Sequence, residues 1–366
     1  MTPDGSVPPR SHRFTGRDGV LLTADVWGEA SSPPLLLLHG GGQTRHAWGR
    51  TGPRLAALGW RVVAPDLRGH GTSEWSADGA YDLGLFADDV RALVDTLAGP
   101  ACPPVLVGAS LGGLGALLAA GEEPRAAVRA LVLVDVAHRP DPRGVRRIVE
   151  FMRGRPDGFA GVEEAAEAVS AYLPHRPRPD GPHRPRSDGP EGTRGPQDPQ
   201  GSPSPQGSPS PQGSPSPQGA RGPQGSPGTK DSQVPQGSTN PQDAKGPQGS
   251  PGTQGSQGPQ GLRNNLRRRG DRWVWHWDPR LLDSFEGRMD PPGMADRLLE
   301  AARRTPAPLL LVRGAISDVV RDDIAQELCA HVPHARRVEV PGAGHMVAGD
   351  RNDHFLDAIA PFLPAP

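Results

Sequence analysis

Short runs of strand type alternate with segments of helical periodicity over most of this chain. Between the runs, apolar residues recur at helical spacing, most clearly from Tyr81 to Leu97. This alternation predicts an α/β fold with a mostly parallel, doubly wound sheet and helices on both faces. The expected strands are Pro34 to Leu38, Arg61 to Pro65, Pro104 to Val107, Ala130 to Val134, Pro308 to Val312 and Ala335 to Val340, preceded by a β-hairpin from Arg13 to Gly28.

The alternation stops at Pro140. Helices are expected at Arg143 to Arg153 and Val162 to Leu173, with no strand between them. Residues 175–261 then consist largely of Gly, Pro, Ser and Gln, which bury too little apolar surface to offset chain entropy, so we expect disorder there. Patterning resumes at Leu262, and further helices are expected at Pro292 to Arg304, Val319 to His331 and Asn352 to Leu363. The predicted organisation is a flexible tail (1–12), a first core segment (13–140), an inserted segment (141–304) and a second core segment (305–366).

Glycine recurs at every third position through parts of this low-complexity stretch, which resembles the pattern of collagen. Other residues break the frame at several points, including Ser204, Val234 and Asn240. Because only glycine fits at the axis of a triple helix, these breaks favour a disordered loop with some polyproline II character.

Composition narrows the classes of protein to consider. The 366 residues include 49 Gly and 45 Pro, only 34% are hydrophobic, and the net charge is −1. A net charge so close to zero gives no reason to expect a nucleic acid or an anionic membrane as partner. Cys102 and Cys329 form neither a disulfide framework nor a metal cluster, and no cofactor motif is present. No signal peptide or membrane span is visible, so a cytoplasmic location is expected.

The stretch from Gly108 to Gly112, GASLG, has the form G-x-S-x-G between an expected strand and an expected helix. This is the pattern of a nucleophile elbow, where small neighbours allow a serine to sit in a strained backbone conformation. Taken alone, the pattern also fits a plain glycine-rich turn whose serine caps the helix. The candidate base, acid and oxyanion donors elsewhere in the chain favour the interpretation of Ser110 as a nucleophile.

Serine catalysis needs a base, an acid that orients the base, and donors for the oxyanion. His345, after the expected strand Ala335 to Val340, is the candidate base. Asp318, after Pro308 to Val312, is the preferred acid, and Asp135, after Ala130 to Val134, is the alternative. The backbone amides of Gly41 and Leu111 are the candidate oxyanion donors.

Five segments together resemble the α/β-hydrolase superfamily: HGGG at His39, DLRGHGTS at Asp66, GASLGG at Gly108, RGAISD at Arg313 and PGAGHM at Pro341. The resemblance implies an α/β-hydrolase fold and assigns residues 141–304 to a helical cap that carries the low-complexity insertion. It also implies that DLRGHGTS is a structural turn beneath the site. Trp273, Trp275 and Trp277 recur at every second position, which places them on one face of an extended segment. Candidates for the pocket roof are Phe151, Met152, Trp273 and Trp277, although the tryptophans also fit a core role.

Several reaction types occur in families with this pattern. Epoxide hydrolases and haloalkane dehalogenases need a carboxylate nucleophile, where this chain has Ser110, and of the two tyrosines only Tyr172 lies in the expected cap. We therefore expect a serine hydrolase that cleaves a small, largely apolar ester or acyl substrate through an acyl-enzyme. Alternatives are an epoxide hydrolase-like enzyme, a carbon–carbon bond hydrolase, a cofactor-free haloperoxidase, or a non-catalytic binding protein whose Pro-rich insertion docks a partner.

Deletion of residues 189–261 distinguishes an enzyme from a docking protein. An enzyme is expected to keep its turnover and its melting temperature, because loop-closure entropy changes only logarithmically with loop length. A docking protein is expected to lose its partner. Turnover of a model ester and thermal unfolding of the full and shortened chains measure this, and a shortened chain that folds but has lost all turnover contradicts the enzyme prediction.

Overall fold

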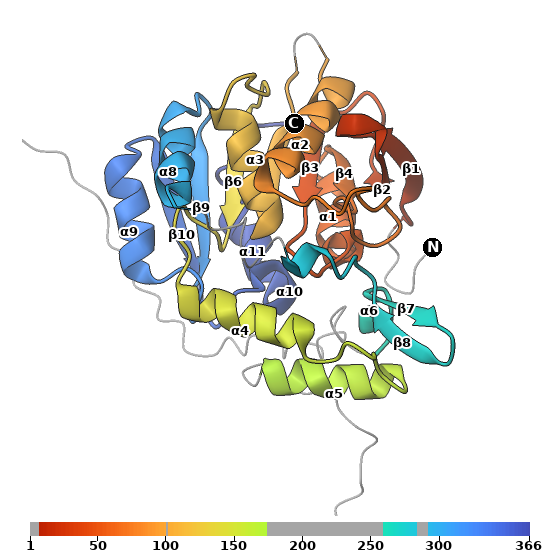
Figure 1. The fold of residues 1–366 in the computed structure, drawn as a ribbon. Coiled ribbons are helices and arrows are strands. Elements are labelled where there is room, and N and C mark those ends of the chain that lie inside the picture. Colours follow the sequence, from red (N-terminus) through yellow and green to blue (C-terminus); the bar gives the residue numbers. More distant parts are fainter. Residues whose placement is uncertain (1–6, 100–101, 174–258, 284–291) are drawn as a thin grey trace, which may run out of the picture. The chain divides into compact units, whose positions relative to one another are not determined.

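The computed structural model describes residues 7–99, 102–173, 259–283 and 292–366, and eight strands of this part of the chain form one sheet (Figure 1). The strand order is β1-β2-β4-β3-β5-β6-β9-β10. The β1–β2 and β2–β4 pairs are antiparallel and all others are parallel. The predicted fold class is confirmed. The strands are β1 (Arg10–Thr15), β2 (Leu21–Trp27), β3 (Pro34–Leu38), β4 (Arg61–Pro65), β5 (Val105–Ala109), β6 (Ala130–Val134), β9 (Leu309–Gly314) and β10 (Ala335–Val340).

Alternate residues of the central strands face two separate hydrophobic cores. In β3, Leu36 and Leu38 belong to the core under α2, α3, α8 and α9, whereas Leu35 and Leu37 belong to the core under α1 and α11. This arrangement follows from the two-residue period of a strand in a sheet covered on both faces. The helices are α1 (Thr51–Ala57), α2 (Leu83–Leu97), α3 (Leu111–Gly121), α8 (Met294–Arg304), α9 (Asp322–His331), α10 (Val347–Asp350) and α11 (Asn352–Ile359), with short 3-10 helices at Arg17–Gly19 and Arg45–Trp48.

Several element boundaries differ by a few residues from the expected ones, and two of these differences have a clear physical reason. Strand β1 begins at Arg10, so the end of the expected tail pairs with β2. Helix α9 begins at Asp322 rather than Val319, because the backbone amides of Val319 and Val320 donate to the Ser317 side chain instead of opening a helix.

The inserted segment, residues 141–304, is described over 141–173, 259–283 and 292–304. It contains α4 (Pro142–Arg153), α5 (Val162–Tyr172), α6 (Pro259–Arg263) and a two-stranded antiparallel sheet of β7 (Leu266–Arg269) and β8 (Arg272–Trp275), followed by α8. Helices α4 and α5 lie below the large sheet in Figure 1. The low-complexity stretch lies almost wholly outside the described residues. Among the helices that the structure describes, none has the length and apolar character needed to cross a membrane.

The loop after β4 carries the DLRGHGTS sequence and is tied to its surroundings by buried polar groups. Asp66 accepts hydrogen bonds from the backbone amides of Arg45 (2.7 Å) and Thr72 (2.9 Å), and it pairs with the Arg45 guanidinium. The guanidinium of Arg68 makes two hydrogen bonds, of 2.6 and 2.7 Å, to the buried carboxylate of Asp89. Each charged group here has an opposite partner, as burial requires. The loop therefore has the structural role that the sequence indicated.

Two buried histidines connect this loop to the glycine-rich loop after β3. Nε2 of His39 accepts the backbone N–H of Leu67 (3.0 Å), and Nε2 of His70 accepts the N–H of Gly42 (3.1 Å). The proton of each ring therefore lies on Nδ1, which faces a backbone carbonyl. Burial lowers the pKa of both rings, and it lowers that of His70 to about 3. Both histidines are neutral supports.

The free energy of unfolding is expected to fall when the pH drops from 7 to 5. The unfolded chain binds a proton at His70 below about pH 6.5, whereas the folded chain keeps this ring neutral until about pH 3. Above pH 6.5 the ring is neutral in both states and His70 does not change the free energy of unfolding. Below that pH, protonation of His70 in the unfolded chain lowers the free energy of unfolding, by about 2 kcal/mol at pH 5. Urea unfolding at the two pH values measures the difference.

The variant His70→Gln tests the assignment. Its amide can still accept the Gly42 N–H but does not titrate, so we expect a smaller loss of stability on acidification. His334→Gln is the matched control, because His334 is exposed. An unchanged pH dependence in a folded His70→Gln protein contradicts the assignment.

Candidate active site

Ser110 lies in the sharp turn between β5 and α3, with φ 45° and ψ −115°. Non-glycine residues rarely adopt a positive φ, so the turn is strained, as expected for a nucleophile elbow. Close packing makes the flanking glycines necessary. A Cβ at Gly108 would lie 2.5 Å from the Gly113 Cα, and one at Gly112 would lie 2.6 Å from the His39 carbonyl oxygen. The backbone thus presents Ser110 at the carboxyl end of the central strand.

The glycine-rich loop after β3 runs directly beside this serine. A Cβ built on Gly40 would lie 3.3 Å from the Ser110 Cβ. The loop is closed by the Gln43 side chain, which accepts the Gly40 N–H at 2.9 Å. Within the described residues, neither the Gly41 nor the Leu111 amide has a protein acceptor. Both expected oxyanion donors are therefore available to a ligand.

His345 is paired with Asp135. Its Nδ1 lies 2.8 Å from Asp135 Oδ2, and the carboxylate is fully buried. Asp135 directly follows β6, has a φ of 48°, and also accepts the Gly314 amide at 2.9 Å and the Ser317 hydroxyl. Since Nδ1 donates to the carboxylate, the proton-accepting nitrogen of the neutral ring is Nε2.

Asp318, the acid preferred from the sequence, does not contact His345. Its carboxylate forms an ion pair of 2.7 Å with Arg147 of α4, and its side chain is about one third exposed (36%). Strand β9 ends at Gly314, and the following bend turns Ser317 toward Asp135 and Asp318 toward the inserted segment. The preference for Asp318 over Asp135 is therefore corrected, because Asp135 holds the place beside the imidazole.

Two of the four expected pocket residues lie on α4, and one of them, Met152, contacts a loop of the candidate site. The Met152 side chain packs on the glycine-rich loop, where a Cβ at Gly42 would lie 3.1 Å from its terminal methyl. Phe151 stacks on Tyr172, with ring centroids 4.2 Å apart, and packs against Trp275 at 5.7 Å. Sequence reasoning left out Trp275 as a pocket candidate. Its place in the period-two tryptophan pattern was the available signal.

The other two candidates do not join this group. Trp273 packs between arginines, with Arg263 and Arg268 over its ring at 5.2 and 5.5 Å. Trp277 lies beyond the end of β8 and is buried in the main core. Trp273 and Trp275 both pack against the small cluster of Phe159, Ala165, Leu262 and Leu266, as the alternation predicts, whereas Trp277 departs from it.

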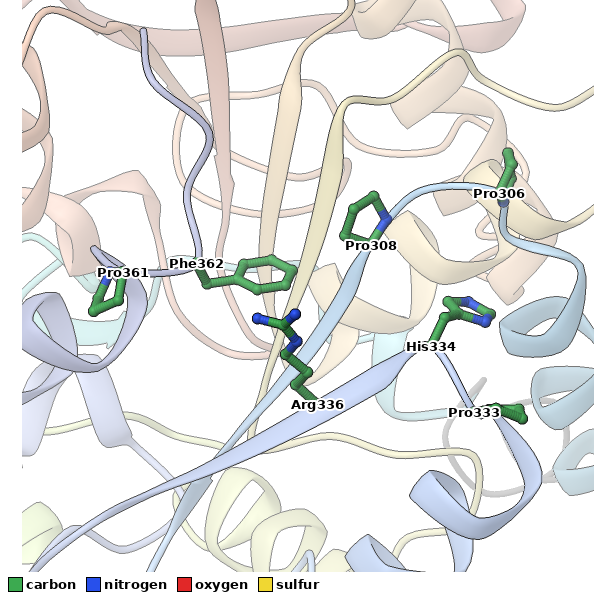
Figure 2. A pocket seen from close by; sticks show the side chains of 7 residues that line it. All are labelled: Pro306, Pro308, Pro333, His334, Arg336, Pro361 and Phe362. Atoms are coloured by element: carbon green, nitrogen blue, oxygen red, sulfur yellow. The ribbon is translucent and has the colours of Figure 1, made fainter. Parts of the chain in front are cut away.

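A surface pocket of about 510 Å³ opens at the opposite end of the sheet, at the amino ends of β9 and β10 (Figure 2). Four prolines line it together with His334, Arg336 and Phe362. Because Ser110 and Asp135 lie at the carboxyl ends of their strands, this pocket is separate from the candidate site. In the part of the chain that the structure describes, no three His, Cys, Asp or Glu side chains converge as metal ligands do.

Comparisons with known proteins agree with this architecture. Protein phosphatase methylesterase 1 of Mus musculus is 34% identical over 42% of this chain and 39% of its own length. Esterase Rv0045c of Mycobacterium tuberculosis is 36% identical over 42% of this chain and 51% of its own length. The chain thus matches only about two fifths to one half of these relatives.

Solved structures extend the likeness to nearly the whole chain. E-2-(acetamidomethylene)succinate hydrolase superposes with a TM-score of 0.65 at 18% identity, over 97% of this chain and 98% of that one. The M. tuberculosis esterase Rv0045c gives 0.61 at 24% identity, over 98% and 93%. At these identities the likeness concerns the fold. The family model described as "alpha/beta hydrolase fold" matches residues 33–351, and the chain therefore belongs to the α/β-hydrolase family.

Proposed function

We propose that the protein is a serine esterase in which Ser110 is the nucleophile, His345 the base and Asp135 the acid. The observation that carries this proposal is the hydrogen bond between His345 Nδ1 and the buried Asp135 carboxylate. It leaves Nε2 free to take a proton from a hydroxyl. A binding protein on the same scaffold has no need of a buried carboxylate aimed at an imidazole.

In the proposed reaction, Nε2 of His345 takes the proton of Ser110 as the serine oxygen attacks the ester carbonyl. The Gly41 and Leu111 amides stabilise the oxyanion. The imidazolium then protonates the leaving alcohol, and an acyl-enzyme remains. Water attacks this ester with His345 again as base, which releases the acid and restores the serine. Asp135 fixes the imidazole tautomer throughout.

The substrate class follows from the surroundings of the nucleophile. Met152 places apolar surface against the glycine-rich loop, which favours a small, largely apolar acyl or alcohol group. The names of the sequence relatives, a methylesterase and an esterase, support carboxylic esters as the first compounds to test. Residues 141–304 are accordingly proposed to be a cap over the site.

Labelling with a fluorophosphonate probe, followed by peptide mapping, tests the nucleophile. We expect the adduct on Ser110 and its loss in His345→Ala. Hydrolysis of p-nitrophenyl esters tests the acid. Asp135→Asn is expected to lower kcat by about 10³- to 10⁴-fold, because an amide selects the wrong imidazole tautomer.

Asp318→Asn is the matched control. It alters a part-exposed ion pair with Arg147, so kcat is expected to stay within a few-fold of the parent value. Thermal unfolding shows that both variants are folded. A large loss of kcat in Asp318→Asn, with none in Asp135→Asn, would reverse the assignment of the acid, and full activity of Ser110→Ala would overturn the esterase proposal.

A further inference from the structure

Ser317 contacts the acid of the proposed triad but has no part in the mechanism given above. It lies in the loop after β9, is 8% exposed, and its hydroxyl is hydrogen-bonded to Asp135 Oδ2. This is the same carboxylate oxygen that receives His345 Nδ1.

The direction of the Ser317 proton follows from its other contacts. The backbone amides of Val319 and Val320 lie 3.2 and 3.1 Å from Oγ, and both are donors. A hydroxyl has two acceptor lone pairs and one proton. With both lone pairs facing N–H groups, the proton points at the carboxylate of Asp135.

Three residues therefore donate to one carboxylate. Gly314, at the end of β9, donates to Oδ1, while Ser317 and His345 donate to Oδ2. Without the serine, Oδ2 is held only by the imidazole whose position it is meant to fix. With a single donor on each oxygen, the rotation of the carboxylate about its Cβ–Cγ bond is less restricted than with three donors.

The part of the loop that leads up to Ser317 is held independently of the serine hydroxyl. The amide of Ser317 donates to the Gly314 carbonyl at 2.9 Å, and the amide of Ala315 donates to the Val340 carbonyl at 3.1 Å. The amide of Ile316 donates to the Ala343 carbonyl at 3.1 Å. Loss of the hydroxyl removes the donor to Asp135 and also the acceptor of the Val319 and Val320 amides, whereas these three backbone hydrogen bonds still hold Ala315, Ile316 and Ser317.

We infer that Ser317 is a positioning residue, whose hydroxyl fixes the Asp135 carboxylate in the orientation that aligns His345. This inference rests on the proposed triad. A charge-assisted hydrogen bond of this kind acts on the chemical step and not on the apolar surface that binds the substrate. Its loss should appear in kcat and leave KM nearly unchanged.

The test uses the full chain and p-nitrophenyl butyrate. Ser317→Ala is expected to lower kcat by about 10- to 100-fold with KM within about twofold. Ser317→Thr restores a hydroxyl and is expected to recover most of kcat. In an Asp135→Asn background, the further change Ser317→Ala should alter kcat by less than about threefold, because the carboxylate that it positions is absent.

Two controls separate positioning from folding. Asp318→Asn alters the next residue of the same loop and should keep the parent kcat. If Ser317→Ala does not fold, Ser317→Cys replaces it. The weakly donating thiol should give a reduced kcat, and an undiminished kcat in this variant overturns the inference.

Other outcomes are equally decisive. Parental kcat in a folded Ser317→Ala protein, with Asp135→Asn inactive, overturns the role of Ser317 and leaves the triad standing. An equal loss of kcat in both backgrounds shows that the serine acts through the loop, which also overturns the role. Activity that survives both Ser110→Ala and Asp135→Asn refutes the proposed function itself.

Discussion

The close contact of α3 with β5 and β3 is the constraint on which the candidate site depends. Where strand and helix meet, a Cβ on Gly108 would lie 2.5 Å from the Gly113 Cα, and one on Gly112 would lie 2.6 Å from the His39 carbonyl oxygen. Only this spacing allows the turn to present Ser110 with a positive φ beside the glycine-rich loop. The strain is maintained by the core, because the strands on either side are fully buried and cannot relax separately.

A second requirement is that the polar groups buried in the loops around the serine are paired within the protein. The buried histidines His39 and His70 supply neutral acceptors for backbone amides, while Asp66 and Arg68 each have a charged partner in the interior. A buried charge without a partner would destabilise the fold strongly. The polar groups beneath the site therefore hold the glycine-rich loop in place without themselves facing a substrate.

The sequence predicted the fold, the strand-end positions of Ser110 and His345, and the supporting loop, because each depends on a local pattern of apolar runs and glycines. It could not decide between Asp135 and Asp318, since both follow a strand and both precede the histidine. The short bend after β9 distinguishes the two in the structure, because it turns Ser317 toward Asp135 and Asp318 toward Arg147. The tryptophan pattern failed for a similar reason: β8 ends at Trp275, so Trp277 leaves the alternation and enters the core.

The placement of Asp135 also has a consequence for the order in which the molecule becomes functional. Its three donors, Gly314, Ser317 and His345, all come from the last part of the chain, far from Asp135 in sequence. Contacts of such large sequence separation form slowly during folding. A chain emerging during synthesis thus carries Ser110 and Asp135, the proposed nucleophile and acid, early, but Asp135 stays without these donors until β9 pairs with β6 and β10 with β9. The onset of ester hydrolysis would therefore mark the moment at which β9 and β10 join the sheet.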